Sequence, residues 1–208
     1  GLSLYNDQIG VSDQTEVGLM YAYHLKFENS TLSFGARGVF HSFKADYTEV
    51  NLGGVNDPRF AGTEINDVKV NFGAGLYWYS DRYYIGLSMP YLTINRFEAN
   101  NSDISFTKER SVYLLAGYVF DIGASDFKIK PYLNFRVPGG APVQLDLNAS
   151  LIYKEQVYLG FGVRPGSSLS AMFEWQIGSF RLGYAADFLH NDSDMFGRGA
   201  NEFLLSYT

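Results

Sequence analysis

The sequence predicts an all-β protein, an antiparallel up-and-down transmembrane β-barrel with about 12 strands in this chain, and three observations lead to this fold class. Apolar and polar residues alternate strictly over runs of about ten residues, which is longer than an ordinary soluble strand and suits a tilted strand across a bilayer. Short and long connections also alternate along the chain. Aromatic residues make up 17% of the total, with 16 Tyr and 17 Phe.

Composition limits the alternatives. We expect a single barrel domain over residues 1–208, because no apolar run reaches the roughly 18 residues of a transmembrane helix. The absence of cysteine removes disulfides, zinc-thiolate sites and thiol nucleophiles. A net charge of −6 argues against a nucleic-acid partner. The chain begins with Gly and no signal segment precedes it, so we expect a processed or truncated chain.

The alternation is clearest between positions 127 and 154, where two apolar faces flank a Pro-Gly-Gly turn. The strand at 31–45 is less regular, because Phe43 falls among polar residues, and there we expect a bulge. The twelve expected strands cover residues 1–6, 17–26, 31–45, 67–80, 82–93, 111–121, 127–137, 142–154, 156–164, 168–177, 180–189 and 201–207.

The connections fall into two classes. Short turns are expected at 28–30, 80–81, 123–126, 154–155 and 178–179, and long or turn-rich connections at 7–16, 46–66, 95–110, 138–141, 165–167 and 190–200. In an up-and-down barrel alternate connections lie at opposite rims, as the short periplasmic turns and long outer loops of outer-membrane barrels do. We therefore expect the protein in the cell outer membrane, with its long loops extracellular.

The two faces of each strand separate by polarity. Val68, Val70, Phe72 and Trp78 are expected to face lipid, and outer-membrane lipid is thus an expected partner. A soluble sandwich is the alternative, but it would have shorter strands and a polar outer face.

Ionisable residues on the opposite face are candidates for the lumen. They are either a selectivity surface or a set of mutually paired groups that fills a narrow lumen, and we favour the second interpretation. Cations outnumber anions in this set, so the lumen would prefer anions over cations if solute passes. The candidates are Arg37, Lys69, Lys128, Lys130, Arg136, Asp146, Lys154, Arg164, Glu174, Arg181 and Asp187.

The sequence offers little for catalysis or metal binding. His24 and His41 both point inward and are expected to be close enough to be neighbours on adjacent strands, but no serine motif accompanies them. Asp192 and Asp194 alternate in the segment 190–194, which lacks the Gly and distal Glu of a calcium loop. We therefore expect a non-enzyme without cofactor or metal.

The long connections 46–66 and 95–110 combine charged residues with exposed apolar residues, a mixture that suits partner binding. The candidate contact residues are Val55, Asp57, Arg59, Phe60, Arg96 and Phe97.

Several motifs resemble one family. The chain carries Asn6-Asp7-Gln8-Ile9-Gly10, then Tyr21-Ala22-Tyr23-His24, then Leu32-Ser33-Phe34-Gly35, and it closes on Glu202-Phe203-Leu204-Leu205-Ser206-Tyr207. This order is similar to the PorP/SprF family of Bacteroidota outer-membrane proteins.

The resemblance implies a role in type IX secretion, as an accessory or surface anchor for exported proteins of the gliding-adhesin type. The implied partners are the C-terminal domain of an exported surface protein or a secretion-system component. Family members usually carry a further N-terminal hairpin, which implies 14 strands in the full-length protein, and no catalytic residues are implied. A small-solute channel with a cationic lumen is the alternative function.

Overall fold

The computed structural model describes residues 1–47, 63–99, 104–189 and 199–207. No helix in these ranges is long and apolar enough to cross a bilayer. The regular structure consists of the strands β1 (Leu2–Ile9), β2 (Ser12–Lys26), β3 (Thr31–Asp46), β4 (Glu64–Tyr79), β5 (Tyr83–Met89), β6 (Asn95–Glu98), β7 (Ser105–Lys108), β8 (Ser111–Tyr118), β9 (Phe120–Asp121), β10 (Phe127–Pro138), β11 (Gln144–Tyr153), β12 (Val157–Arg164), β13 (Ser168–Ile177), β14 (Phe180–Leu189) and β15 (Ala200–Tyr207).

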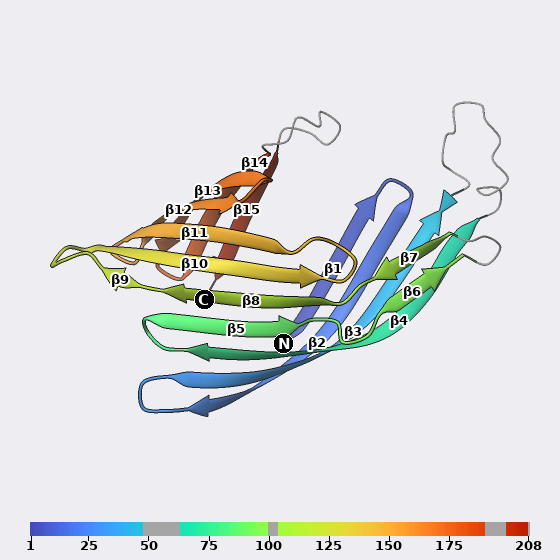
Figure 1. Cartoon of the computed structure of the whole chain (residues 1–208), viewed down its shortest axis with the longest axis horizontal. Coiled ribbons are helices and arrows are strands. Elements are labelled where there is room, and N and C mark those ends of the chain that lie inside the picture. The colour runs from blue at the N-terminus through green and yellow to red at the C-terminus, as the bar shows by residue number, and fades with distance from the viewer. Residues whose placement is uncertain (48–62, 100–103, 190–198, 208) are drawn as a thin grey trace.

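One large antiparallel sheet contains all of these strands except β6 and β7, which form a 2-stranded sheet of their own. Within the large sheet, 12 strands follow one another in chain order from β1 to β15, and the short β9 lies beside β10. The sheet is strongly curved, and β6 and β7 lie on its concave side (Figure 1). The fold class predicted from the sequence is confirmed in strand number, direction and order. The edge strands β1 and β15 do not pair with each other in the described residues.

The connections lie at two rims, as expected. One rim, the short-turn rim, carries the connections 27–30, 80–82, 119–126, 154–156 and 178–179. The other rim, the long-loop rim, carries 10–11, 47–63, 90–110, 139–143, 165–167 and 190–199. At the short-turn rim, Lys154 and Glu155 both have positive φ (52° and 57°), the geometry of the tight turn that matches strand twist in a hairpin.

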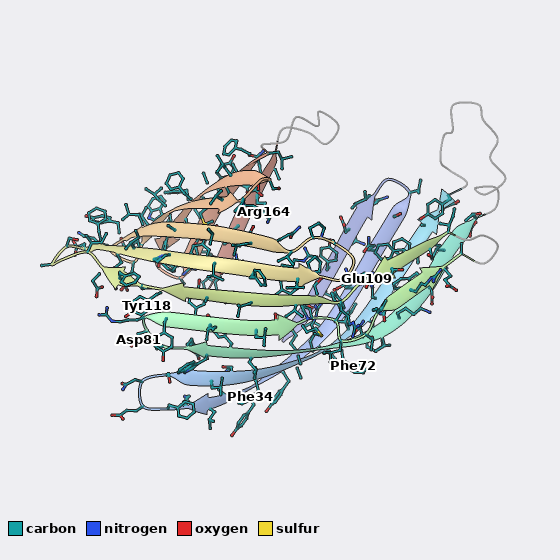
Figure 2. All side chains as sticks on the ribbon, viewed as in Figure 1. Phe34, Phe72, Asp81, Glu109, Tyr118 and Arg164 are labelled. Atoms are coloured by element: carbon teal, nitrogen blue, oxygen red, sulfur yellow. The ribbon has the colours of Figure 1, made fainter. Side chains whose placement is uncertain are left out.

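The convex face is apolar and exposed. On β4, Val68, Val70 and Phe72 are between 48% and 59% exposed, whereas Asn71 between them is fully buried. Phe34 and Phe72 point away from the sheet on this face (Figure 2). A water-soluble sandwich would bury these side chains, so the pattern is that of a sheet with hydrocarbon outside.

Two local predictions were wrong. Residues 7–16 do not form a long connection: β1 and β2 pair without interruption up to Ile9 and Ser12, and Gly10, with φ +58°, turns the chain. No bulge occurs at Phe43 either, because β3 keeps an unbroken register with both neighbours. Phe43 simply belongs to the concave face, where β6 and β7 cover it.

Candidate functional site

Apart from Lys154, which lies in the turn 154–156, the ionisable residues predicted for the lumen lie on the strand face opposite the exposed apolar residues, and most of them are paired. One pair on the second half of the sheet joins Arg164 to both oxygens of Asp146, with Nε–Oδ1 at 2.6 Å and Nη2–Oδ2 at 3.1 Å. The other predicted residues with a carboxylate partner are Arg37 (Glu16, 3.5 Å), Lys69 (Asp67, 2.6 Å), Lys154 (Asp126, 3.7 Å), Arg181 (Glu174, 3.8 Å) and Lys128 (Glu155).

Two predicted cations on β10 have no carboxylate within 4.0 Å in the described part of the chain. Lys130 lies over the ring of Tyr132 at 5.4 Å, and Arg136 lies over the ring of Tyr113, also at 5.4 Å. Asp187 is in register with Ser170 of the neighbouring strand. The inner face therefore keeps a positive excess along β10.

The main feature of the concave face is an insert, which we define as residues 90–99 and 104–110 with the strands β6 and β7. The insert leaves the sheet after β5 and returns at β8, although β5 and β8 pair directly with each other. It crosses β4 at Gly73, where a Cβ atom would lie 2.5 Å from the backbone oxygen of Pro90. Only glycine permits so close a crossing, and this glycine therefore fixes where the insert begins.

Asn71 ties the start of the insert to β4. Its side chain is fully buried; Nδ2 donates to the Thr93 carbonyl at 2.7 Å and to Asn95 Oδ1 at 3.2 Å. Its Oδ1 accepts from the backbone N–H groups of Leu92 and Thr93 at 3.1 and 3.2 Å. One amide thus satisfies donors and acceptors that the turn would otherwise leave open.

Glu16 ties the end of the insert to β2. This carboxylate is 5% exposed, lies 3.1 Å from Nζ of Lys108 on β7, and accepts hydrogen bonds from the Tyr91 hydroxyl at 2.6 and 2.8 Å. Arg37 and His41 of β3 approach the same carboxylate at 3.5 and 3.8 Å. Burial, and after it the hydrogen bond to Glu16, raise the pKa of Tyr91, so its hydroxyl remains a proton donor.

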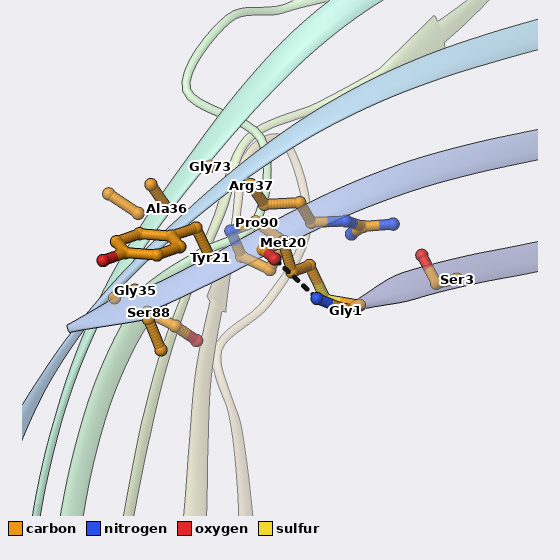
Figure 3. Close-up of a pocket in the computed structure, with 13 residues that line it drawn as sticks. Gly1, Ser3, Met20, Tyr21, Gly35, Ala36, Arg37, Gly73, Ser88 and Pro90 are labelled. Atoms are coloured by element: carbon orange, nitrogen blue, oxygen red, sulfur yellow. Dashed lines mark hydrogen bonds between the residues drawn. The ribbon is translucent and has the colours of Figure 1, made fainter. Parts of the chain in front are cut away.

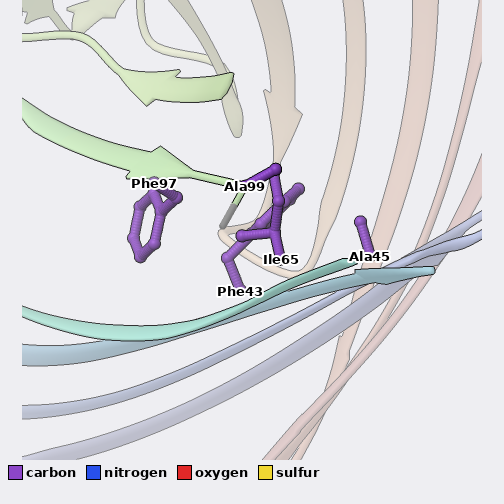
Figure 4. Close-up of a cluster of buried hydrophobic side chains, with 5 residues drawn as sticks. All are labelled: Phe43, Ala45, Ile65, Phe97 and Ala99. Carbon is purple, nitrogen blue, oxygen red and sulfur yellow. The ribbon is translucent and has the colours of Figure 1, made fainter. Parts of the chain in front are cut away.

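An apolar cluster holds the middle of the insert. Phe97 and Ala99 of the insert pack on Phe43, Ala45 and Ile65 of β3 and β4 (Figure 4). Phe106, which is partly buried against the same cluster, stacks on Phe43 with ring centroids 4.4 Å apart, and the His41 ring meets Phe97 edge-on at 4.9 Å. The polar lumen predicted from the sequence therefore contains a dry patch near the long-loop rim.

A cavity of about 730 Å³ adjoins the insert on the concave face. Small residues of β2, β3 and β4 line it, and Arg37 and Pro90 lie at its border with the insert (Figure 3). The N-terminal amine of Gly1 donates to the Met20 carbonyl at 2.7 Å beside it. The lining is mostly apolar or glycine, so the cavity by itself holds no chemistry for a specific ligand.

The predicted partner-binding residues have different positions. Val55, Asp57, Arg59 and Phe60 lie outside the described residues. Arg96 forms an exposed ion pair with Glu98 on the outer side of the hairpin, with Nε–Oε1 at 2.9 Å. Phe97 is 0% exposed, which corrects the expectation that it contacts a partner: its ring is directed to the barrel wall, because β3 presents Phe43 there.

The histidines are not neighbours, contrary to our expectation. In the β2–β3 register His24 faces Ser33 and His41 faces Glu16, at opposite ends of the two strands. His24 Nδ1 lies 2.7 Å from Ser33 Oγ. Within the described residues no three His, Asp or Glu side chains are grouped to hold a metal ion, and the segment 190–194 lies outside them.

Three residues central to this arrangement, Glu16, Asn71 and Tyr91, escaped the sequence analysis. Glu16 fell in the connection wrongly assigned to 7–16, and Tyr91 was included at the end of an expected strand. Asn71 alternates with Val70 and Phe72, which is typical of an inner-face residue, but nothing in this pattern indicates that its side chain bonds to backbone. A signal for Glu16 was present, since it alternates with Val17 and continues the strand that follows.

A protein-family model described as "Type IX secretion system membrane protein PorP/SprF" matches residues 1–207. The match confirms the resemblance found in the sequence motifs and extends it over almost the whole chain. No curated protein matches the chain.

Proposed function

Since the chain belongs to the PorP/SprF family of type IX secretion system membrane proteins, we propose that it is an outer-membrane barrel that serves as a non-enzymatic accessory or surface anchor for proteins exported by that system. The exposed apolar belt anchors the barrel in lipid. The long-loop rim faces the cell exterior and receives the exported protein, through its C-terminal domain or through another component of the system.

The observation that supports this proposal concerns the two connections predicted to bind the partner, 47–63 and the insert. Both are held by the same apolar cluster, which forms a common base for them. Ala45 and Ile65, at the two ends of the first connection, pack in the same cluster as Phe97 and Ala99 of the insert. The Tyr47 N–H donates to the Thr63 carbonyl at 3.1 Å and closes that base. Loops that rise from a common packed base lose less conformational entropy on binding than independent loops do.

In this arrangement Phe97 has a supporting role and the partner contacts come from the exposed side of the insert and from the first connection. Arg96 and Glu98, at 62% and 63% side-chain exposure, present a charge pair on that side. Exposed ion pairs add little stability to the fold, so both groups are available to a partner at small cost.

Replacing residues 48–62 and 100–103 by short turns tests the proposal. We expect the exported surface protein to lose its retention at the cell surface, measured by its release into the medium and by its co-purification with the barrel. The matched control shortens the 190–199 connection at the same rim. Unchanged retention after the double replacement, with the barrel inserted normally, would contradict the docking role.

A second candidate function is a small-solute channel, which the unpaired cations Lys130 and Arg136 on β10 favour. Conduction by the purified full-length barrel in a planar bilayer, with a reversal potential that indicates anion preference, would support it. Substituting both cations by Gln should then abolish the preference. A channel that stays anion-selective without them argues against this role for β10.

A further inference from the structure

The insert is attached to the barrel wall mainly by side chains, with one backbone hydrogen bond from the Leu92 N–H to the Phe72 carbonyl of β4 at 2.8 Å. The strands β6 and β7 pair only with each other and do not join the ladder of the large sheet. A two-stranded hairpin in isolation is marginally stable. Its position on the concave face therefore depends on the contacts of Asn71, the aromatic cluster and Glu16.

The Glu16 contact can be lost while the wall stays intact. Lys108 and Tyr91 reach Glu16 from the insert, whereas Arg37 and His41 reach it from β3. If the insert moves away, the carboxylate keeps the Arg37 guanidinium at 3.5 Å and is not left as an isolated buried charge, which would be very costly. The wall is thus compatible with both a docked and an undocked insert.

The insert is likewise suited to two positions. The far side of the β6–β7 hairpin is polar and exposed, with the Arg96–Glu98 pair and Ser105, which is aligned with Glu98. Its near side carries Phe97 and Phe106, which would meet water on release. The docked position is therefore favoured over the undocked one. It is held by the small apolar cluster around Phe97 and Phe106 and by the Lys108–Glu16 ion pair.

We propose that the insert is a plug that closes the barrel lumen near the long-loop rim, and that Glu16 is the latch that keeps it docked through Lys108 and Tyr91. The plug separates the cavity next to Pro90 from the long-loop rim, and its release opens a path for small hydrophilic solutes. This inference concerns the same insert as the docking proposal, but its tests measure labelling and conductance, whereas the docking proposal is tested by retention of an exported protein.

Thiol labelling measures release directly, because the chain contains no Cys. In the full-length protein, Ala99→Cys places one thiol at a position that is only 9% exposed while the insert is docked. A hydrophilic maleimide should label it slowly, and adding Glu16→Gln should accelerate labelling by at least about tenfold, the effect expected for a lost buried charge-assisted contact. The matched control is Glu174→Gln, which alters an inner-face ion pair on β13 far from the insert.

A second variant distinguishes release of the insert from a general folding defect of the barrel. Lys108→Met removes the cation that the insert places at Glu16 and leaves Glu16 with Arg37, so the wall should remain intact while labelling at position 99 still accelerates. Heat-modifiable gel migration reports whether each variant forms the barrel. Equal labelling rates for Glu16→Gln, Lys108→Met and Glu174→Gln in folded barrels would overturn the latch.

Conductance measures the consequence. The unaltered full-length barrel in a planar bilayer should be closed most of the time, and Glu16→Gln should raise its open fraction in parallel with the labelling rate, whereas Glu174→Gln should not. Faster labelling without any increase in conductance would show that the insert moves but does not seal the lumen, and the proposed plug would be wrong.

Discussion

Replacing Asn71 by Ala should loosen the first half of the insert without unfolding the barrel. The substitution deletes four hydrogen bonds to residues 92–95. The Leu92 N–H keeps its bond to the Phe72 carbonyl at 2.8 Å, whereas the Thr93 N–H and C=O and the Phe72 N–H lose their hydrogen bonds to Asn71. Each such group costs about 1–3 kcal/mol when buried. Thr93 is itself exposed, and water can partly replace Asn71.

We therefore expect the local opening free energy of the insert to fall by about 2–3 kcal/mol, which is roughly a 30- to 150-fold increase in the open population. Hydrogen exchange followed by mass spectrometry in detergent or lipid should show this loss of protection in peptides covering residues 91–98. Protection in β10 to β14 should not change, because local opening of one unit leaves the others intact.

Asn148→Ala is the matched control, since Asn148 also lies on the inner face but its Nδ2 has no hydrogen-bond partner. This variant should leave exchange in the insert as it is in the unaltered protein. If Asn71→Ala produced no more exchange at residues 91–98 than Asn148→Ala, Asn71 would not be the anchor that its hydrogen bonds indicate. Loss of protection throughout the sheet would mean instead that Asn71 stabilises the wall.

Three further outcomes are expected. Gly73→Ala should displace the start of the insert, because the new Cβ would lie 2.5 Å from the Pro90 oxygen; limited proteolysis should cut this segment faster, whereas Gly38→Ala, where the space is open, should behave as the unaltered protein does. Leu147→Arg, on the exposed apolar face, should destabilise the barrel in lipid by about 2–4 kcal/mol in reversible urea unfolding, and a smaller loss than for Asn148→Arg on the inner face would contradict the assignment of faces. Lys154→Asn should stabilise the barrel by a few tenths to about 1 kcal/mol, because Asn tolerates the positive φ there, and a lower unfolding midpoint would refute this.

The sequence predicted the wall well, because the alternation of apolar and polar residues within each strand shows which residues lie on each of its two faces. In an antiparallel meander the side-chain period of two is a local property, and the partner of each strand is the next one in the chain. The pattern at 68–78 therefore sufficed to place Phe72 on the exposed face, where the structure has it. The order of the strands followed from the turns alone.

The interior was not predictable in the same way. Strands of four residues, such as β6 and β7, are too short to show a period, and their partners lie on strands distant in the sequence. Phe43 carried the only hint, as an apolar residue on a polar face, and we attributed it to backbone irregularity. The correct cause was a second layer, which a pattern analysis of one strand cannot detect. Glu16 contacts Tyr91 across 75 positions of sequence, and no motif announces such a pair.

The docking surface of the insert also has a consequence for how the polypeptide assembles. The contacts of the insert with Asn71, with the apolar cluster and with Glu16 all lie on β2, β3 and β4, which are synthesised before it. The first half of the polypeptide thus contains a folding nucleus. It consists of the long strands β2, β3 and β4 and the apolar cluster that packs the insert against β3 and β4. We expect this half to acquire its structure first during insertion, and the later strands to be added one by one to an edge that is already ordered.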